Sequence, residues 1–171
     1  MTEEEERDRI RAKFDHIMSM LSKWPEDRVK TILKERLEKE GWDITHVSMG
    51  SERGKDLEAI KDDKIIHIEA KGEPKSPSNY RNERRSFIGG ALMSLIAHMN
   101  EKTANNMFCM AFPDNDYYLR GVKTRIPLYV RNKLRLFTIF LGDEDTIMVL
   151  LPNASDARTL NSFEELFSTN R

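Results

Sequence analysis

The chain has 171 residues, and its 28 lysines and arginines nearly balance its 29 aspartates and glutamates. This length suits one domain over residues 1–171, and the near-neutral charge argues against a polycation that binds nucleic acid over its whole surface. The one cysteine, Cys109, excludes a disulfide scaffold and a cysteine-based zinc site, and the four scattered histidines exclude a histidine-rich metal site.

Two features predict a cytoplasmic protein with no membrane partner. The longest stretch without a charge or a strong polar interruption, Ile88–Ala97, is far too short to cross a bilayer. The opening residues, MTEEEERDRI, are acidic, whereas a signal peptide needs a basic region followed by an apolar one. The sequence contains neither a P-loop nor a G-x-G-x-x-G motif, so we expect no nucleotide cofactor.

The first half of the chain is predicted to contain two helices followed by three strands. Apolar residues recur at helical spacing in residues 1–24, and Trp24-Pro25 then interrupts the helix. A second helix over 26–40 ends at Gly41, where glycine suits a C-cap. The strands of this half are predicted at 43–49, 56–61 and 64–72, the last two forming a hairpin through Asp62-Asp63.

The second half is predicted to begin with a strongly apolar helix over 83–99. Gly89-Gly90 inside it is costly unless close packing on a sheet requires bare backbone there. The further predicted elements are a strand at 107–112, a helix at 116–125, a short helix or loop to 134, strands at 136–141 and 146–151, and a short helix at 162–167. This interleaving favours an α/β fold, a mixed β-sheet flanked by helices.

The predicted hairpin places acidic residues opposite one another. With the turn centred between Asp62 and Asp63, Asp56 stands opposite Glu69, and alternation separates an apolar face from a polar one. Like charges directly opposed destabilise a sheet unless something neutralises them. The apolar face comprises Leu57, Ala59, Ile66, Ile68 and Ala70, and the polar face comprises Asp56, Glu58, His67, Glu69 and Lys71.

A magnesium ion would neutralise Asp56 and Glu69, because Mg²⁺ prefers oxygen ligands and is commonly held by one or two carboxylates with water. Lys71 follows Glu69 on the same face and would lie beside a metal-bound water. This combination suits phosphodiester hydrolysis, in which the metal activates water and a lysine orients or deprotonates it.

The segments Gly54-Lys55-Asp56-Leu57 and Ile66-His67-Ile68-Glu69-Ala70-Lys71 resemble the PD-(D/E)XK nuclease superfamily. The resemblance implies a restriction-endonuclease-like core of order αβββαβ over residues 26–113. Residues 1–24 would then be an extra N-terminal helix, and residues 114–171 would complete the sheet with C-terminal strands.

The resemblance also implies a Mg²⁺-dependent deoxyribonuclease, more often an endonuclease than an exonuclease, in which Mn²⁺ substitutes for Mg²⁺. Asp56, Glu69 and the backbone carbonyl of Ala70 would hold the metal, and Lys71 would act on the attacking water. The sequence lacks the proline that often precedes the aspartate. Relatives commonly add a glutamate from the first core helix, and Glu26 is the best substitute here.

Three D/E-x-K matches occur in the chain, but only Glu69-Ala-Lys71 lies in a predicted strand opposite an acid. The alternative for these residues is a solvated edge hairpin with an ordinary ion pair. For the whole chain, the alternative is a catalytically inactive module of the same fold that binds DNA or a protein partner.

Basic residues in two regions are candidates for DNA contact. Arg81, Arg84 and Arg85 open the long apolar helix, where Arg84 would reach a phosphate or steady an active-site carboxylate. Arg120, Lys123 and Arg125 belong to an acid-free stretch with interleaved tyrosines, which suits phosphate contact and stacking. Alternatively, the three arginines belong to a solvated first turn of the helix, and the acid-free stretch is a pair of surface helices whose aromatic residues lie in the core. In a third reading, the stretch pairs with the acidic N-terminal arm of the same chain or of a homodimer partner.

Overall fold

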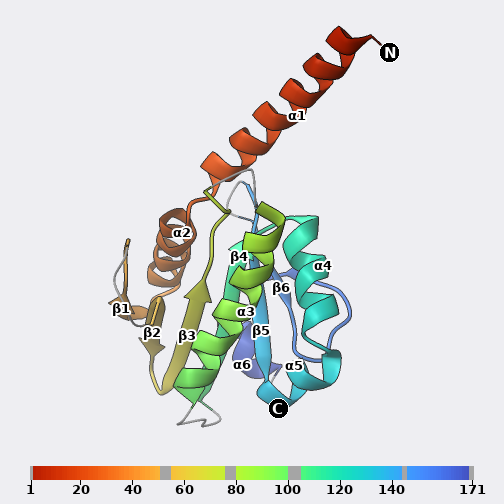
Figure 1. Ribbon diagram of the computed structural model, residues 1–171. Helices are drawn as coiled ribbons and strands as arrows, with labels where there is room; N and C mark the ends of the chain where they lie inside the picture. Colours follow the sequence, from red (N-terminus) through yellow and green to blue (C-terminus); the bar gives the residue numbers. More distant parts are fainter. Residues whose placement is uncertain (1, 51–54, 76–79, 100–104, 144–145, 170–171) are drawn as a thin grey trace.

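A computed structural model describes residues 2–50, 55–75, 80–99, 105–143 and 146–169. Within these ranges, six helices and seven strands form an α/β fold with one mixed sheet (Figure 1). The helices are α1 (Glu3–Lys23), α2 (Glu26–Lys39), α3 (Tyr80–His98), α4 (Asp116–Arg125), α5 (Leu128–Leu134) and α6 (Glu165–Ser168). The strands are β1 (Asp43–Val47), β2 (Leu57–Lys61), β3 (Lys64–Ala70), β4 (Asn106–Pro113), β5 (Leu136–Leu141), β6 (Ile147–Leu150) and β7 (Arg158–Thr159).

The strands lie in the sheet in the same order as in the sequence. β1, β2 and β3 are antiparallel neighbours, β3, β4 and β5 are parallel, and β6 and β7 add antiparallel strands to the far edge. Parallel neighbours need crossover connections. Helix α3 makes the crossover from β3 to β4, and α4 with α5 make the one from β4 to β5.

The core is divided into two layers by the sheet. Met107, Cys109 and Ala111 of β4 join a buried cluster with α2 and α6, whereas Phe108 and Phe112 join one with α3 and α4. A central parallel strand is buried on both faces, which explains the nearly continuous apolar run of β4. Cys109 is a fully buried free thiol of this core, and burial raises its pKa.

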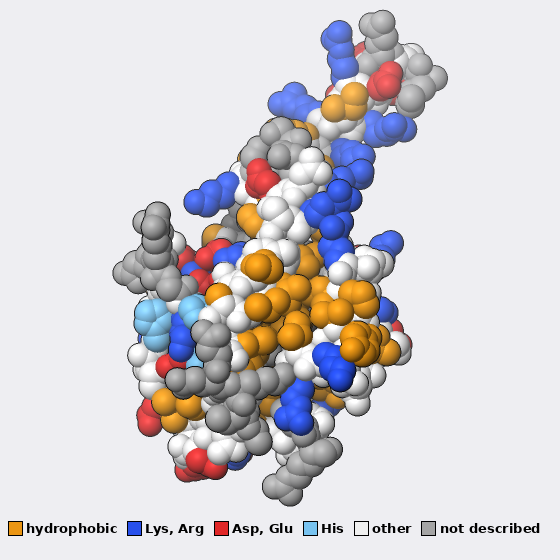
Figure 2. All heavy atoms as spheres, turned by 60° about the horizontal axis from the view of Figure 1, so that its bottom comes forward, with side chains coloured by type: hydrophobic (Ala, Val, Ile, Leu, Met, Phe, Trp, Pro, Cys, Tyr) orange, Lys and Arg blue, Asp and Glu red, His pale blue; other side chains and the backbone are white. Residues whose placement is uncertain are grey.

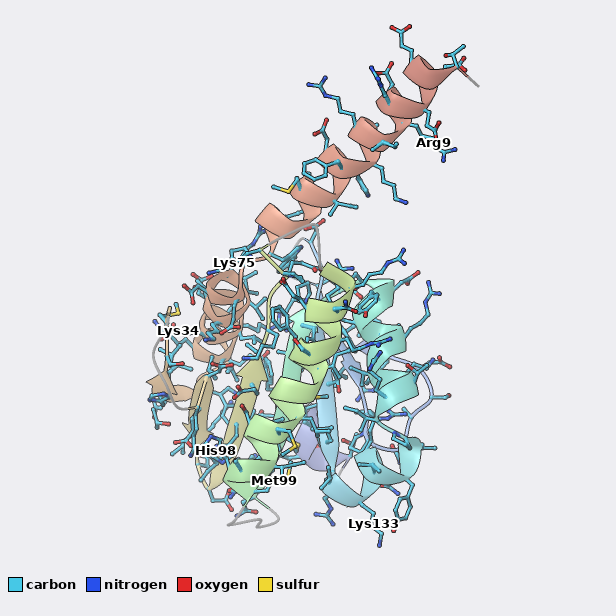
Figure 3. All side chains as sticks on the ribbon, in the orientation of Figure 1. Arg9, Lys34, Lys75, His98, Met99 and Lys133 are labelled. Atoms are coloured by element: carbon cyan, nitrogen blue, oxygen red, sulfur yellow. The ribbon has the colours of Figure 1, made fainter. Side chains whose placement is uncertain are left out.

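Helix α1 projects away from the body of the molecule (Figures 1 and 3). On its apolar stripe, Ile10 is 60% and Phe14 51% exposed. Figure 2 shows a second apolar area on the body, and the exposed large hydrophobic side chains of α3 and α5 are Met93, Ile96, Leu128 and Tyr129. No helix among the described residues is long and apolar enough to span a membrane.

The sequence left the surroundings of Gly89-Gly90 open and did not predict strand β7. Gly89 and Gly90 are exposed, and a β-carbon built on either glycine would have nothing within 4 Å. Close packing on the sheet therefore does not account for glycine at either position. Strand β7 was not predicted, because two exposed residues give no readable alternation.

Candidate functional site

The β2–β3 hairpin has the predicted register, with Leu57 paired to Ile68, Ala59 to Ile66 and Lys61 to Lys64. Its turn is tight, and Asp62 adopts a left-handed backbone with φ of 54°. The apolar face of the hairpin is fully buried against α2. A shift of one residue would bury the charged face instead, so the alternation fixes where the acidic residues stand.

Asp56 lies immediately before β2, opposite the end of β3. Its backbone carbonyl accepts a hydrogen bond from the Ser48 amide at 2.9 Å. Its Oδ2 accepts one from the Ala70 amide at 2.8 Å. The Asp56 carboxylate therefore continues the ladder between the two strands and is held in one orientation, with only 6% of the residue exposed.

The Lys71 ammonium lies among three carboxylates. Its Nζ is 3.5 Å from Glu69 Oε1, 3.6 Å from Asp56 Oδ2 and 3.6 Å from Glu26 Oε2. Burial and the charge of Asp56 raise the pKa of Glu69 to about 7, although Lys71 acts in the opposite direction. Glu69 is therefore an acid whose ionised form needs further positive charge.

Lys30 forms a second cationic centre beside Asp56. Its Nζ lies 2.8 Å from Asp56 Oδ1 and 2.8 Å from Glu26 Oε1. Burial lowers the pKa of Lys30, but the hydrogen bonds to Asp56 and Glu26 outweigh it, so the pKa is raised and the side chain is charged. Asp56 therefore shares its two carboxylate oxygens between two lysines.

Close backbone contact brings Glu26 to this site. Glu26 opens α2, and the Glu73 amide donates to the Trp24 carbonyl at 2.7 Å. A β-carbon at Gly72 would press against the backbone of Trp24, Pro25 and Glu26. Glycine at position 72 thus permits the end of β3 to lie directly against the start of α2.

The donor set around Lys71 suits a hard divalent cation. Asp56 and Glu69 supply carboxylate oxygens. The Ala70 carbonyl lies on the Asp56 edge, since the N–H and C=O of a strand residue point the same way. No three Asp, Glu, His or Cys side chains among the described residues form a ready-made metal cluster. The carboxylates lie around lysine ammonium groups instead.

Arg84 lies beneath the surface in a buried ion pair. Its Nε donates to Glu73 Oε2 at 2.6 Å, and Glu73 Oε1 accepts from Asn115 Nδ2 at 2.6 Å. Tyr118 Oη donates to the Gly72 carbonyl at 2.7 Å. These bonds tie the end of β3 to α3 and to the start of α4, so Arg84 steadies a carboxylate two residues beyond Lys71.

Four of the six basic residues predicted to contact DNA line one shallow groove between the start of α3 and α4. Lys123 lies outside this groove lining and pairs with Asp156 at 3.0 Å. The Arg84 guanidinium lies 5.2 Å from the ring of Tyr117, a groove residue, so the buried pair connects the groove to the end of β3. The groove is lined by Arg81, Arg85, Asp116, Tyr117, Arg120, Gly121, Thr124 and Arg125.

His67, on the polar face of the hairpin, contacts Glu58 and Phe108. It lies 3.0 Å from Glu58 and stacks on Phe108, with 4.9 Å between ring centroids. Burial and the charge of Lys55 lower the pKa of His67, so the imidazole is neutral near pH 7.

Sequence reasoning did not assign a role to Lys30 or Glu73. A signal for Lys30 was present, because Val29, Leu33 and Leu37 place it on the buried stripe of α2. A lysine on such a stripe needs a buried partner. Glu73 gave no such signal, since its partners come from distant segments of the chain.

No family model matches the chain, and no curated protein matches it. Among solved structures, the fold of this chain is similar to the crystal structure of an XisH family protein from Nostoc punctiforme PCC 73102. The TM-score is 0.39 and the identity 17%, over 68% of this chain and 91% of that chain. A likeness of this size establishes neither a family nor an activity.

Proposed function

We propose that the chain is a divalent-cation-dependent nuclease that hydrolyses DNA phosphodiester bonds on a PD-(D/E)XK core. The observation that carries this proposal is the position of Lys71, within 3.6 Å of carboxylate oxygens of Glu26, Asp56 and Glu69. An ordinary surface ion pair does not need three buried or half-buried acids around one ammonium.

The order of elements supports the same proposal. From α2 to β4 the chain runs helix, three strands, helix, strand, which is the core order of the PD-(D/E)XK fold. The acids and the lysine lie where β2 begins and β3 ends, near the carboxyl ends of the parallel strands. Open α/β sheets commonly bind ligands at that edge.

Asp56 and Glu69 would hold Mg²⁺, with the Ala70 carbonyl as a third oxygen. The bound metal would lower the pKa of water and stabilise charge that develops on the phosphate. Lys71 would donate hydrogen bonds to the attacking water or to a phosphate oxygen, since an ammonium group has three donors and no acceptor. Glu69, with its pKa of about 7, would be ionised by the same positive charge.

The arginine groove would hold the DNA backbone. Arg81, Arg85 and Arg125 supply guanidinium groups, which bind phosphate oxygens in a bidentate manner. The groove begins beside the Glu73–Arg84 pair, and Glu73 is two residues from Lys71 in the chain. A DNA backbone lying in the groove would therefore pass the proposed catalytic residues. Phosphate contacts position DNA without reading its sequence.

The experiment is a cleavage assay on single-stranded, duplex and branched DNA with Mg²⁺, Mn²⁺ or EDTA. We expect metal-dependent cleavage of at least one substrate, and loss of it in Asp56→Asn, which keeps an acceptor for the Ala70 amide. Salt-dependent DNA binding without cleavage by the wild type would favour the inactive binding module instead. Cleavage that persists in Asp56→Asn would refute the assigned metal site.

A further inference from the structure

Lys30 lies where the pattern of α2 calls for an apolar residue. Val29 and Leu33 are fully buried beside it, and the Lys30 side chain is itself only 2% exposed. A buried ammonium is costly unless nearby charges compensate it. Glu26 and Asp56 provide that compensation, each through an oxygen 2.8 Å from Lys30 Nζ.

The two oxygens of Asp56 face different surroundings. Oδ1 accepts from Lys30, with the Ser48 hydroxyl at 3.5 Å. Oδ2 accepts from the Ala70 amide and lies 3.6 Å from Lys71 Nζ. Asp56 therefore borders two positions for positive charge, one shared with Glu26 and the other with Glu69.

We propose that Lys30 permanently fills the position between Asp56 Oδ1 and Glu26, so that this site takes one divalent cation rather than two. The inference rests on the proposed function and adds to it the number of metal ions. A carboxylate-bridged pair of cations is the common alternative for enzymes that cleave phosphodiesters. Here a side chain from α2 replaces one member of that pair.

The charges of the site agree with a single metal. With Glu26, Asp56 and Glu69 ionised and Lys30 and Lys71 protonated, the cluster carries one net negative charge. One divalent cation reverses this to a single positive charge, which suits an incoming phosphodiester. Two divalent cations beside two buried ammonium groups would add strong repulsion between like charges.

The test counts Mn²⁺ bound to the full chain, by electron paramagnetic resonance of the free ion. We expect one Mn²⁺ per wild-type chain and two per Lys30→Met chain, because methionine keeps the length of the side chain and removes its charge. In the double variant Lys30→Met/Glu26→Gln the count should return to one, since the second position loses a carboxylate. Circular dichroism checks that each variant is folded.

Two Mn²⁺ per wild-type chain would overturn the inference while leaving the proposed function standing. The same holds for a folded Lys30→Met chain that still binds one ion. The wild-type count needs no variant, so the inference stays open to refutation even if Lys30→Met does not fold. Absence of Mn²⁺ binding by the wild type would overturn the proposed function and this inference together.

Discussion

Asp56 is the residue on which the site depends, because its two oxygens are committed to different partners. One oxygen binds Lys30, and the other binds the Ala70 amide beside Lys71. The sequence predicts that Asp56 stands opposite Glu69, since the hairpin register follows from alternation alone. It does not predict the sharing of Asp56 between two lysines, because Lys30 reaches it from another element.

Glu69 makes the stability of the metal-free protein depend on pH. Its pKa is raised from 4.5 to about 7, so between these values the folded chain binds more protons than the unfolded chain. Stability should therefore fall as pH rises from about 5 to about 8, with Glu69 contributing up to about 3 kcal/mol of the loss. Urea unfolding in EDTA measures this.

Glu69→Gln is the matched control, because glutamine has a similar shape and does not titrate. The difference in unfolding free energy between wild type and Glu69→Gln isolates this group from others that titrate nearby, such as His67. A difference that stays constant across this pH range would show that the Glu69 pKa is not raised.

At the scale of elements, two glycines that look alike in the sequence have opposite roles. Gly72 lies against the backbone at the start of α2, whereas Gly89 lies on the open face of α3. We expect Gly72→Ala to lower the unfolding free energy by about 1–3 kcal/mol or more, because the backbone must move to admit the methyl group. Gly89→Ala should raise it by about 0.5–1 kcal/mol through better helix propensity.

Chemical denaturation of the two alanine variants beside the wild type checks this pair of expectations. A stable Gly72→Ala chain would mean that α2 does not need to approach β3 this closely. A destabilised Gly89→Ala chain would mean that something covers the outer face of α3.

The Glu73–Arg84 pair ties the end of β3 to α3 and, through Asn115, to the start of α4, and we predict how its loss changes the free energy of unfolding. Because the pair is buried, Arg84→Met leaves an unpaired carboxylate and should lower the unfolding free energy by about 3 kcal/mol. Adding Glu73→Gln should recover part of this loss, since the unpaired charge is then gone. Thermal and urea unfolding of the single and double variants measure both effects.

A role of Arg84 in phosphate contact alone would give a different result. Arg84→Met would then weaken DNA binding and leave the unfolding free energy unchanged. The double variant would be no more stable than the single one.

The helices and strands that the sequence predicts are those that local residue patterns define. Alternation and apolar runs locate β2, β3 and β4, and turn residues locate their ends. The partner of Arg84, by contrast, depends on how the end of β3 packs against α3 and the start of α4. Local sequence indicates that Arg84 could steady a carboxylate, but it carries no signal that this carboxylate is Glu73.

For the whole molecule, the near-neutral net charge is the sum of unlike regions. Acids converge at the start of β2 and the end of β3, whereas arginines line the groove between α3 and α4. The basic stretch was predicted from the sequence, but the separation of Lys123 from Arg120 and Arg125 was not. That separation requires knowing which face of α4 meets the groove.

The groove gives a salt-dependence prediction. Each phosphate contact contributes about −0.9 to the slope of log affinity against log salt concentration for duplex DNA. We expect Arg81→Ala/Arg125→Ala to weaken DNA binding and reduce the slope by about 2, one for each lost contact. Fluorescence anisotropy at several salt concentrations measures the slope.

Lys123→Ala is the matched control, because Lys123 lies on the same helix outside the groove. It should leave the slope unchanged. Equal losses from the control and from the groove variant would show only a general electrostatic effect.

Lys71 is proposed to act on the reacting groups, so DNA cleavage by Lys71→Met is the sharpest test of its role. The comparison is Lys75→Met, because Lys75 is exposed just beyond the end of β3, at the same end of the molecule (Figure 3). We predict that Lys71→Met lowers the metal-dependent cleavage rate by at least about 100-fold while the chain stays folded, and that Lys75→Met cleaves at the wild-type rate. Cleavage by Lys71→Met at the wild-type rate would show that Lys71 does not act on the reacting groups.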